Sequence, residues 1–95
     1  MRLAFVNTLS ELAAKDKNVW LVTGDLGFSV FEDFIKRFPD QYLNVGVSEQ
    51  NMIGVAAGLA LAGKRPFAYS ISTFATMRPY EQIRNDVCYQ NLPVT

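Results

Sequence analysis

The fold is decided by the stretch Asn44-Val45-Gly46-Val47-Ser48-Glu49-Gln50-Asn51-Met52-Ile53-Gly54, in which a short apolar run gives way to a helix. Ser48 is predicted to cap this helix, which would cover residues 49–62 and end at Gly63. In an α/β sheet, ligands bind beyond the carboxyl ends of the strands. A carboxylate in the first helical turn behind a strand lies at that place, so Glu49 is the first candidate for a working residue.

The alternation of strand and helix extends in both directions from this stretch. Apolar periodicity and breaker residues predict helices at residues 2–15, 31–38, 49–62 and 79–89, and strands at residues 19–23, 42–47, 66–72 and 92–95. This order favours a three-layer αβα fold with a mostly parallel sheet covered on both faces. The last predicted strand has only begun at Thr95, so we expect a truncated domain, part of a longer protein.

The composition excludes several function classes. Nine basic and nine acidic residues balance, which gives no bulk attraction to nucleic acid or to an acidic membrane, and near neutrality favours association instead. Cys88 is the only cysteine and there is no histidine, which excludes an internal disulfide, a Cys/His zinc site and a Ser-His or Cys-His catalytic pair. No secretory core and no apolar run of about 20 residues occurs, so we expect a soluble, cytoplasmic protein.

Several segments together resemble the pyrimidine-binding domain of transketolase-type enzymes, which use thiamine diphosphate. They are Gly24-Asp25-Leu26-Gly27, the run from Asn44 to Gly54, Ala57-Gly58-Leu59-Ala60-Leu61-Ala62-Gly63-Lys64, and Phe74 through Arg78, Tyr80, Gln82 and Asp86 to Leu92-Pro93-Val94. They occur in the family's order over nearly the whole chain. The resemblance is strongest to the carboxyl-terminal subunit of split transketolases, and it implies that residues 1–95 are part of a pyrimidine-binding domain.

The resemblance implies a catalytic role for Glu49. The matching glutamate of the family hydrogen-bonds the N1′ nitrogen of the cofactor's aminopyrimidine. Proton sharing there favours the 4′-imino tautomer, whose nitrogen can take the proton from thiazolium C2 and leave a nucleophilic ylid. Judged without its neighbours, Glu49 would be read as an exposed glutamate at a helix start, and the surrounding pattern reverses that preference.

Four further residues are implied to bind the cofactor. Phe74 matches an aromatic that packs on the pyrimidine ring, Arg78 and Tyr80 match positions near that pocket, and Asp25 matches an aspartate near the thiazolium side. Each also has a plainer interpretation: Phe74 as core, and Asp25 as a turn-forming residue. Gln82 is a weaker candidate that could equally be a polar group on a helix surface.

The family's segment for diphosphate and metal is missing. The chain contains no Gly-Asp-Gly, so a partner domain or subunit of the transketolase type is expected to hold the diphosphate and Mg²⁺, which makes hetero- or homo-oligomers obligatory for catalysis. The resemblance favours transfer of a two-carbon ketol unit between sugar phosphates of pentose phosphate metabolism. Deoxyxylulose-phosphate synthase, the beta subunit of a 2-oxo-acid dehydrogenase and a noncatalytic interaction module of the same fold remain alternatives. Alone, the chain is expected to be inactive.

Overall fold

The computed structural model describes residues 1–95, and strand β1 (Val19–Thr23) lies at the centre of its sheet. Strands β2 (Tyr42–Asn44) and β3 (Arg65–Tyr69) flank β1 on either side, and both run parallel to it. In the register, Leu21 of β1 lies opposite Tyr42 on one side and Phe67 on the other. The predicted parallel sheet is therefore confirmed.

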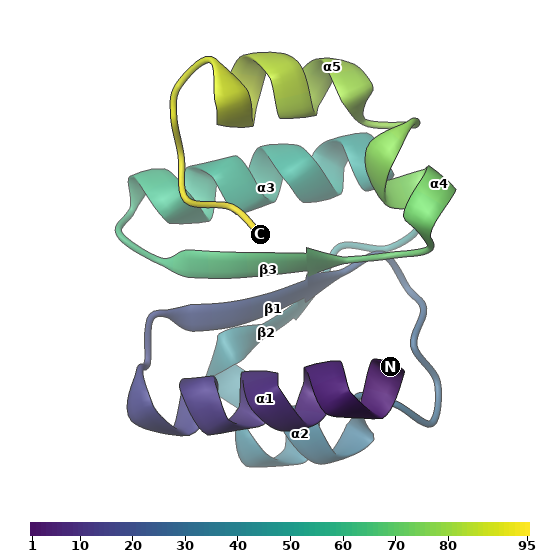
Figure 1. Ribbon diagram of the computed structural model, residues 1–95, viewed down its shortest axis with the longest axis vertical. Helices are drawn as coiled ribbons and strands as arrows, with labels where there is room; N and C mark the ends of the chain where they lie inside the picture. The colour runs from purple at the N-terminus through teal and green to yellow at the C-terminus, as the bar shows by residue number, and fades with distance from the viewer.

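Helices cover both faces of the sheet (Figure 1). Helices α1 (Arg2–Lys15) and α2 (Glu32–Arg37) lie on one side, and a 3₁₀ turn, η1 (Pro39–Gln41), leads from α2 to β2. On the other side lie α3 (Glu49–Leu61), α5 (Tyr80–Gln82) and a π-helical segment, η2 (Ile83–Cys88), that continues α5. This arrangement confirms the three-layer αβα fold. None of the helices is both long enough and apolar enough to span a lipid bilayer.

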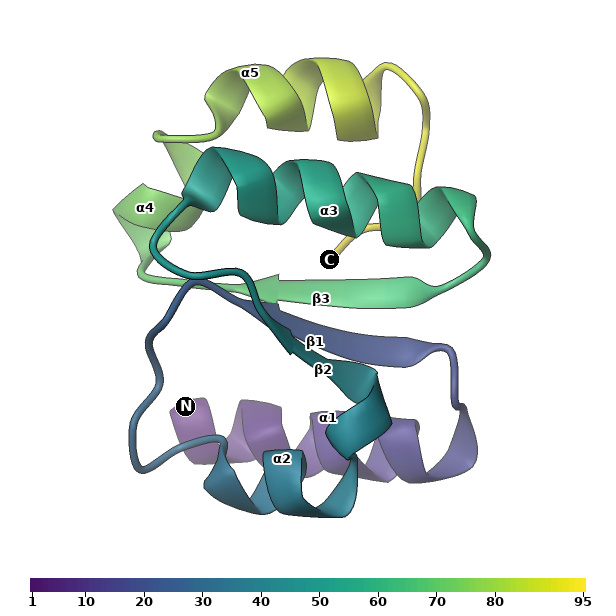
Figure 2. The ribbon, with the colours of Figure 1, turned by 180° about the vertical axis from the view of Figure 1, so that it is seen from behind.

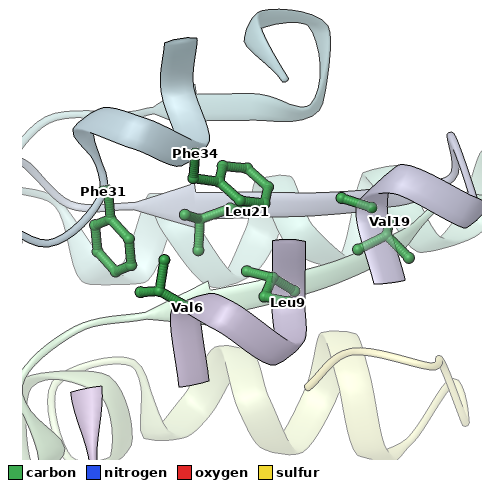
Figure 3. Close-up of a cluster of buried hydrophobic side chains, with 7 residues drawn as sticks. Val6, Leu9, Val19, Leu21, Phe31 and Phe34 are labelled. Atoms are coloured by element: carbon green, nitrogen blue, oxygen red, sulfur yellow. The ribbon is translucent and has the colours of Figure 1, made fainter. Parts of the chain in front are cut away.

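The strand side chains alternate between two hydrophobic clusters. Val19 and Leu21 of β1 face α1 and α2, where the larger cluster also contains Val6, Leu9, Ala13, Phe31 and Phe34 (Figure 3). Val22 points the other way and packs with Met52 and Ile53 of α3. Full burial of one such aliphatic or aromatic side chain contributes about 1.5–3 kcal/mol. The period-two alternation of β1 thus fixes α3 against one face of the sheet.

Two strands end earlier than predicted, and both ends shape the loops beyond the sheet. The strand predicted for residues 42–47 ends at Asn44, because Gly46 turns the chain with a φ of +80°. The strand predicted for residues 66–72 ends at Tyr69 and is followed by a short helix, α4 (Ser72–Thr76), that the sequence analysis did not predict. The sheet is therefore shorter at its carboxyl edge than the sequence predicts.

Two other expectations hold only in part. Ser48 is the residue before α3, as predicted, but its Oγ donates to the carbonyl of Val45 at 3.3 Å, and its side chain does not cap the helix. Residues 92–95 do not form a regular strand. Thr95 nevertheless donates to the carbonyl of Pro66 at 3.1 Å and accepts from the N–H of Ala68 at 2.7 Å, which is the pattern of a parallel pairing with β3.

The Glu32 carboxylate accepts backbone hydrogen bonds at the start of α2, and this makes the stability of the fold depend on pH. Its Oε1 accepts the backbone N–H of Ser29 at 2.7 Å, and backbone N–H groups of Glu32 itself and of Ser29 lower the pKa of its carboxyl group. A lowered folded-state pKa stabilises the fold above the unfolded-state pKa, and this contribution is lost as the pH falls through the folded-state value. Glu32→Gln should therefore lower the melting temperature slightly at pH ~7 and leave it close to the wild-type value in acid. An equal difference at both pH values would contradict this prediction.

Candidate active site

The predicted site residues follow the carboxyl ends of the three strands. Asp25 comes after β1, Glu49 comes after β2, and Phe74 and Arg78 come after β3. Because the strands are parallel, these segments meet at one edge of the sheet. Figure 2 shows the strand arrowheads, the start of α3 and helix α4 at this same end of the molecule. In α/β folds this is the edge at which ligands bind.

Glu49 is a buried carboxylate at the first position of α3. Its side chain is only 6% exposed, and Nη1 of Arg78 donates to its Oε1 at 3.2 Å. The amino end of a helix favours negative charge, and a buried charge needs a partner. Both conditions are met here, so Glu49 is held in place with one carboxylate oxygen engaged by a planar N–H donor.

Arg78 also stacks on Phe74. The guanidinium carbon lies 3.4 Å from the centroid of the Phe74 ring, which is a cation–π contact. The Arg78 side chain is 47% exposed, whereas the next residue, Pro79, is fully buried. Gln50 donates through Nε2 to the carbonyl of Arg78 at 3.4 Å. The backbone of this segment is therefore anchored, and its arginine links Glu49 to Phe74.

A polar hollow of about 520 Å³ opens beside this group. It is bordered by Ser48, Glu49, Gln50, Asn51 and Arg78. Pockets for small ligands commonly have volumes of ~300–1,000 Å³. A carboxylate oxygen, amide side chains and a nearby aromatic face suit a flat, nitrogen-containing ring that shares a proton with the carboxylate.

Asp25 and Tyr80 lie apart from this hollow. Asp25 is exposed and has a φ of +58°; its N–H donates to Oδ1 of Asn44 at 2.8 Å, and Nδ2 of Asn44 donates to its Oδ1 at 3.2 Å. Asp25 borders a separate cavity of about 110 Å³. Tyr80 is 68% exposed and borders neither cavity. The structure therefore brings together Glu49, Phe74 and Arg78, and the cofactor roles of all five predicted residues stay predictions.

The comparison with known proteins decides the family. The pattern that describes the transketolase pyrimidine-binding domain matches residues 1–95. The chain belongs to this family. The transketolase family is thus confirmed for the whole of the described chain, as the resemblance of its motifs predicted.

Individual relatives point to the same family. A protein of Methanocaldococcus jannaschii described as a transketolase C-terminal section is 48% identical over 95 residues, covering 99% of this chain and 30% of that protein. A 1-deoxy-D-xylulose-5-phosphate synthase of Oleidesulfovibrio alaskensis is 47% identical over 93 residues, covering 96% of this chain and 14% of the synthase. A split-gene transketolase solved as an inactive beta4 tetramer superposes with a TM-score of 0.87 at 42% identity, covering 96% of this chain and 31% of the solved one. The chain thus spans less than a third of the length of these proteins.

Three residues of the hollow were missed by the sequence analysis as site residues. Ser48 was assigned a capping role only, and Gln50 and Asn51 were given none. All three residues lie directly beside Glu49 at the start of the helix, and this position could have indicated that they border the site. Gln82, a weak candidate, has a buried Oε1 without a hydrogen-bond partner but does not border the hollow.

The residues present fit the aminopyrimidine of the family's cofactor. The Arg78 guanidinium is itself a flat nitrogen group that contacts Oε1 of Glu49 and lies on the Phe74 ring. Glu49 and Phe74 can therefore bind a flat nitrogen heterocycle in the place of the guanidinium. No cluster of three or more His, Cys, Asp or Glu side chains that could hold a metal ion occurs in the structure.

Proposed function

We propose that this chain is a thiamine diphosphate-dependent, transketolase-type transferase subunit that moves a two-carbon ketol unit between sugar phosphates. It contributes Glu49 as the catalytic residue, with Phe74, Arg78, Asp25 and Tyr80 around the cofactor. Residues 1–95 act as part of a pyrimidine-binding domain, in the cytoplasm, within pentose phosphate metabolism. The transketolase C-terminal section and the split-gene transketolase among its relatives support this assignment.

The observation that carries the proposal is the placement of Glu49 and Phe74 around one flat nitrogen group. Glu49 would share a proton with N1′ of the pyrimidine through its buried carboxylate, and Phe74 would support the face of the ring. Thiamine diphosphate supplies a nucleophilic carbon that carries the two-carbon unit. The low exposure of Glu49 keeps water from competing for its oxygens.

The same proposal requires a partner. The sequence has no Gly-Asp-Gly segment, so a diphosphate-binding domain or subunit of the transketolase type would hold the diphosphate and Mg²⁺. The solved relative described as an inactive beta4 tetramer supports the view that a chain of this type is incomplete without that partner. The active form is then a hetero- or homo-oligomer in which the cofactor lies between the two domains.

Calorimetry tests this requirement. Thiamine diphosphate and Mg²⁺ titrated into this protein alone, at micromolar concentration, should give no binding heat, because only the pyrimidine half of the site is present. Adding the Gly-Asp-Gly-containing partner subunit should restore binding. Tight binding by the protein alone would contradict the shared site.

The 1-deoxy-D-xylulose-5-phosphate synthase reaction is the second candidate, because synthases from several bacteria are 40–47% identical to this chain. A synthase decarboxylates a 2-oxo acid, whereas ketol transfer releases no carbon dioxide. The assembled enzyme should convert a ketose phosphate donor and an aldose phosphate acceptor without releasing carbon dioxide. Carbon dioxide release from pyruvate, with no turnover of the ketose phosphate, would favour the synthase.

A further inference from the structure

Arg78 covers the surface on which a pyrimidine would stack. Phe74 does not border the polar hollow, whereas Arg78 does, and the guanidinium lies 3.4 Å from the centre of the Phe74 ring. A ring entering the hollow therefore reaches Glu49 but meets Arg78 where it should meet Phe74. We infer that Arg78 occupies the pyrimidine's place in the cofactor-free protein and must swing aside, to a position beside the cofactor, before the ring can bind. This inference rests on the proposed function.

The displacement can take place in the side chain alone. On the carboxyl side of the Arg78 Cα atom, Gln50 holds the carbonyl of Arg78 and Pro79 is fully buried. On its amino side, the N–H of Met77 donates to the carbonyl of Thr73 at 3.0 Å. The side chain is 47% exposed and has several rotatable bonds leading into solvent. The side chain of Arg78 can therefore move while the backbone that carries it stays in place.

The incoming ring must replace two contacts, and this makes the site selective. When Arg78 leaves, the buried Glu49 loses its cationic partner, and an unpaired buried charge is costly. A ring that shares a proton with Glu49 and stacks on Phe74 restores both contacts. A flat apolar ring restores only the stacking and leaves the buried Glu49 without a partner. Such a ring should therefore not displace Arg78.

The need to displace Arg78 should weaken cofactor binding by a measurable factor. A cation–π contact and an ion pair at a half-exposed arginine together weaken ring binding by about threefold to thirtyfold. Arg78→Gln removes both contacts from the empty site and should therefore tighten thiamine diphosphate binding to the assembled enzyme by this factor. Arg84 is the matched control, because it is exposed, forms no ion pair and undergoes the same loss of charge in Arg84→Gln.

The experiment combines calorimetry with nuclear magnetic resonance on the assembled protein. In the cofactor-free wild type, the Nε–H resonance of Arg78 should be shifted upfield by the ring current of Phe74, and thiamine diphosphate should abolish that shift. In the titrations, Arg78→Gln should bind thiamine diphosphate more tightly than the wild type, and Arg84→Gln should match the wild type.

The outcomes separate this inference from the proposed function. An Arg78 resonance without a ring-current shift, or an Arg78→Gln variant that binds no more tightly than Arg84→Gln, would overturn the inference while leaving cofactor binding and its activation by Glu49 in place. If neither the wild type nor any variant binds thiamine diphosphate with the partner subunit present, the proposed function fails, and the displacement of Arg78 by the cofactor fails with it.

Discussion

Glu49→Gln is expected to slow C2-proton exchange of bound thiamine diphosphate in the assembled enzyme by about a hundredfold to ten-thousandfold, the usual contribution of a positioned acid–base group. The amide keeps the size of the side chain and can still accept from Arg78 in the cofactor-free protein, so the fold should remain. An amide cannot share a proton with N1′ as a carboxyl group can. The measurement is the rate at which the C2 proton exchanges with deuterium, followed after rapid acid quenching.

Glu81→Gln provides the matched control for this experiment. Glu81 is exposed and lies in the first turn of α5, so the substitution makes the same chemical change at a helix start away from the hollow. Its exchange rate should equal that of the wild type. If Glu49→Gln still binds the cofactor and its C2-proton exchange rate is unchanged, Glu49 is not the activating residue.

The sequence predicts the layers well because the layers depend on local patterns. Val19 to Thr23 is an apolar run bounded by breaker residues, and the helix from Glu49 to Leu61 begins and ends close to its predicted bounds. Helix α4 was missed because it has only five residues, too few for a helical period to emerge. The segment after Gln82 lies inside the helix predicted at residues 79–89, but its π-helical form was not predicted, because such segments are rare.

Three of the five predicted site residues lie together, but their contacts with one another were not predictable. Family resemblance places Glu49, Phe74 and Arg78 near one ligand, and parallel strands explain why segments about 25 residues apart along the chain meet. The stacking of Arg78 on Phe74 depends on the turn at Met77 to Pro79, which no local pattern specifies. For the same reason, the pairing of Asp25 with Asn44 across two strand ends was not foreseen.

The second large effect is expected at Gly27, the last residue of the Gly-Asp-Leu-Gly turn. Gly27 has a φ of +96°, and a Cβ atom placed there would overlap Cδ2 and Cε2 of Phe31, which is 2% exposed in the main core cluster. The left-handed backbone costs an L-residue about 1–2 kcal/mol. Forcing a methyl group into a packed core costs a further ~1–3 kcal/mol. Gly27→Ala should therefore lower the free energy of unfolding by about 2–5 kcal/mol, measured by urea denaturation.

Gly46 separates the two causes of this effect. Its φ is +80°, but a Cβ atom there would meet nothing within 4 Å, so Gly46→Ala should lose only the backbone contribution of about 1–2 kcal/mol. Phe31→Leu removes the ring that the new methyl group would strike, and in the Gly27→Ala background it should cost less than it does alone. Such coupling is the mark of direct contact, because substitutions at distant sites add independently. Equal losses for the two glycine variants, or strictly additive losses at Gly27 and Phe31, would show that the turn does not depend on packing against the ring.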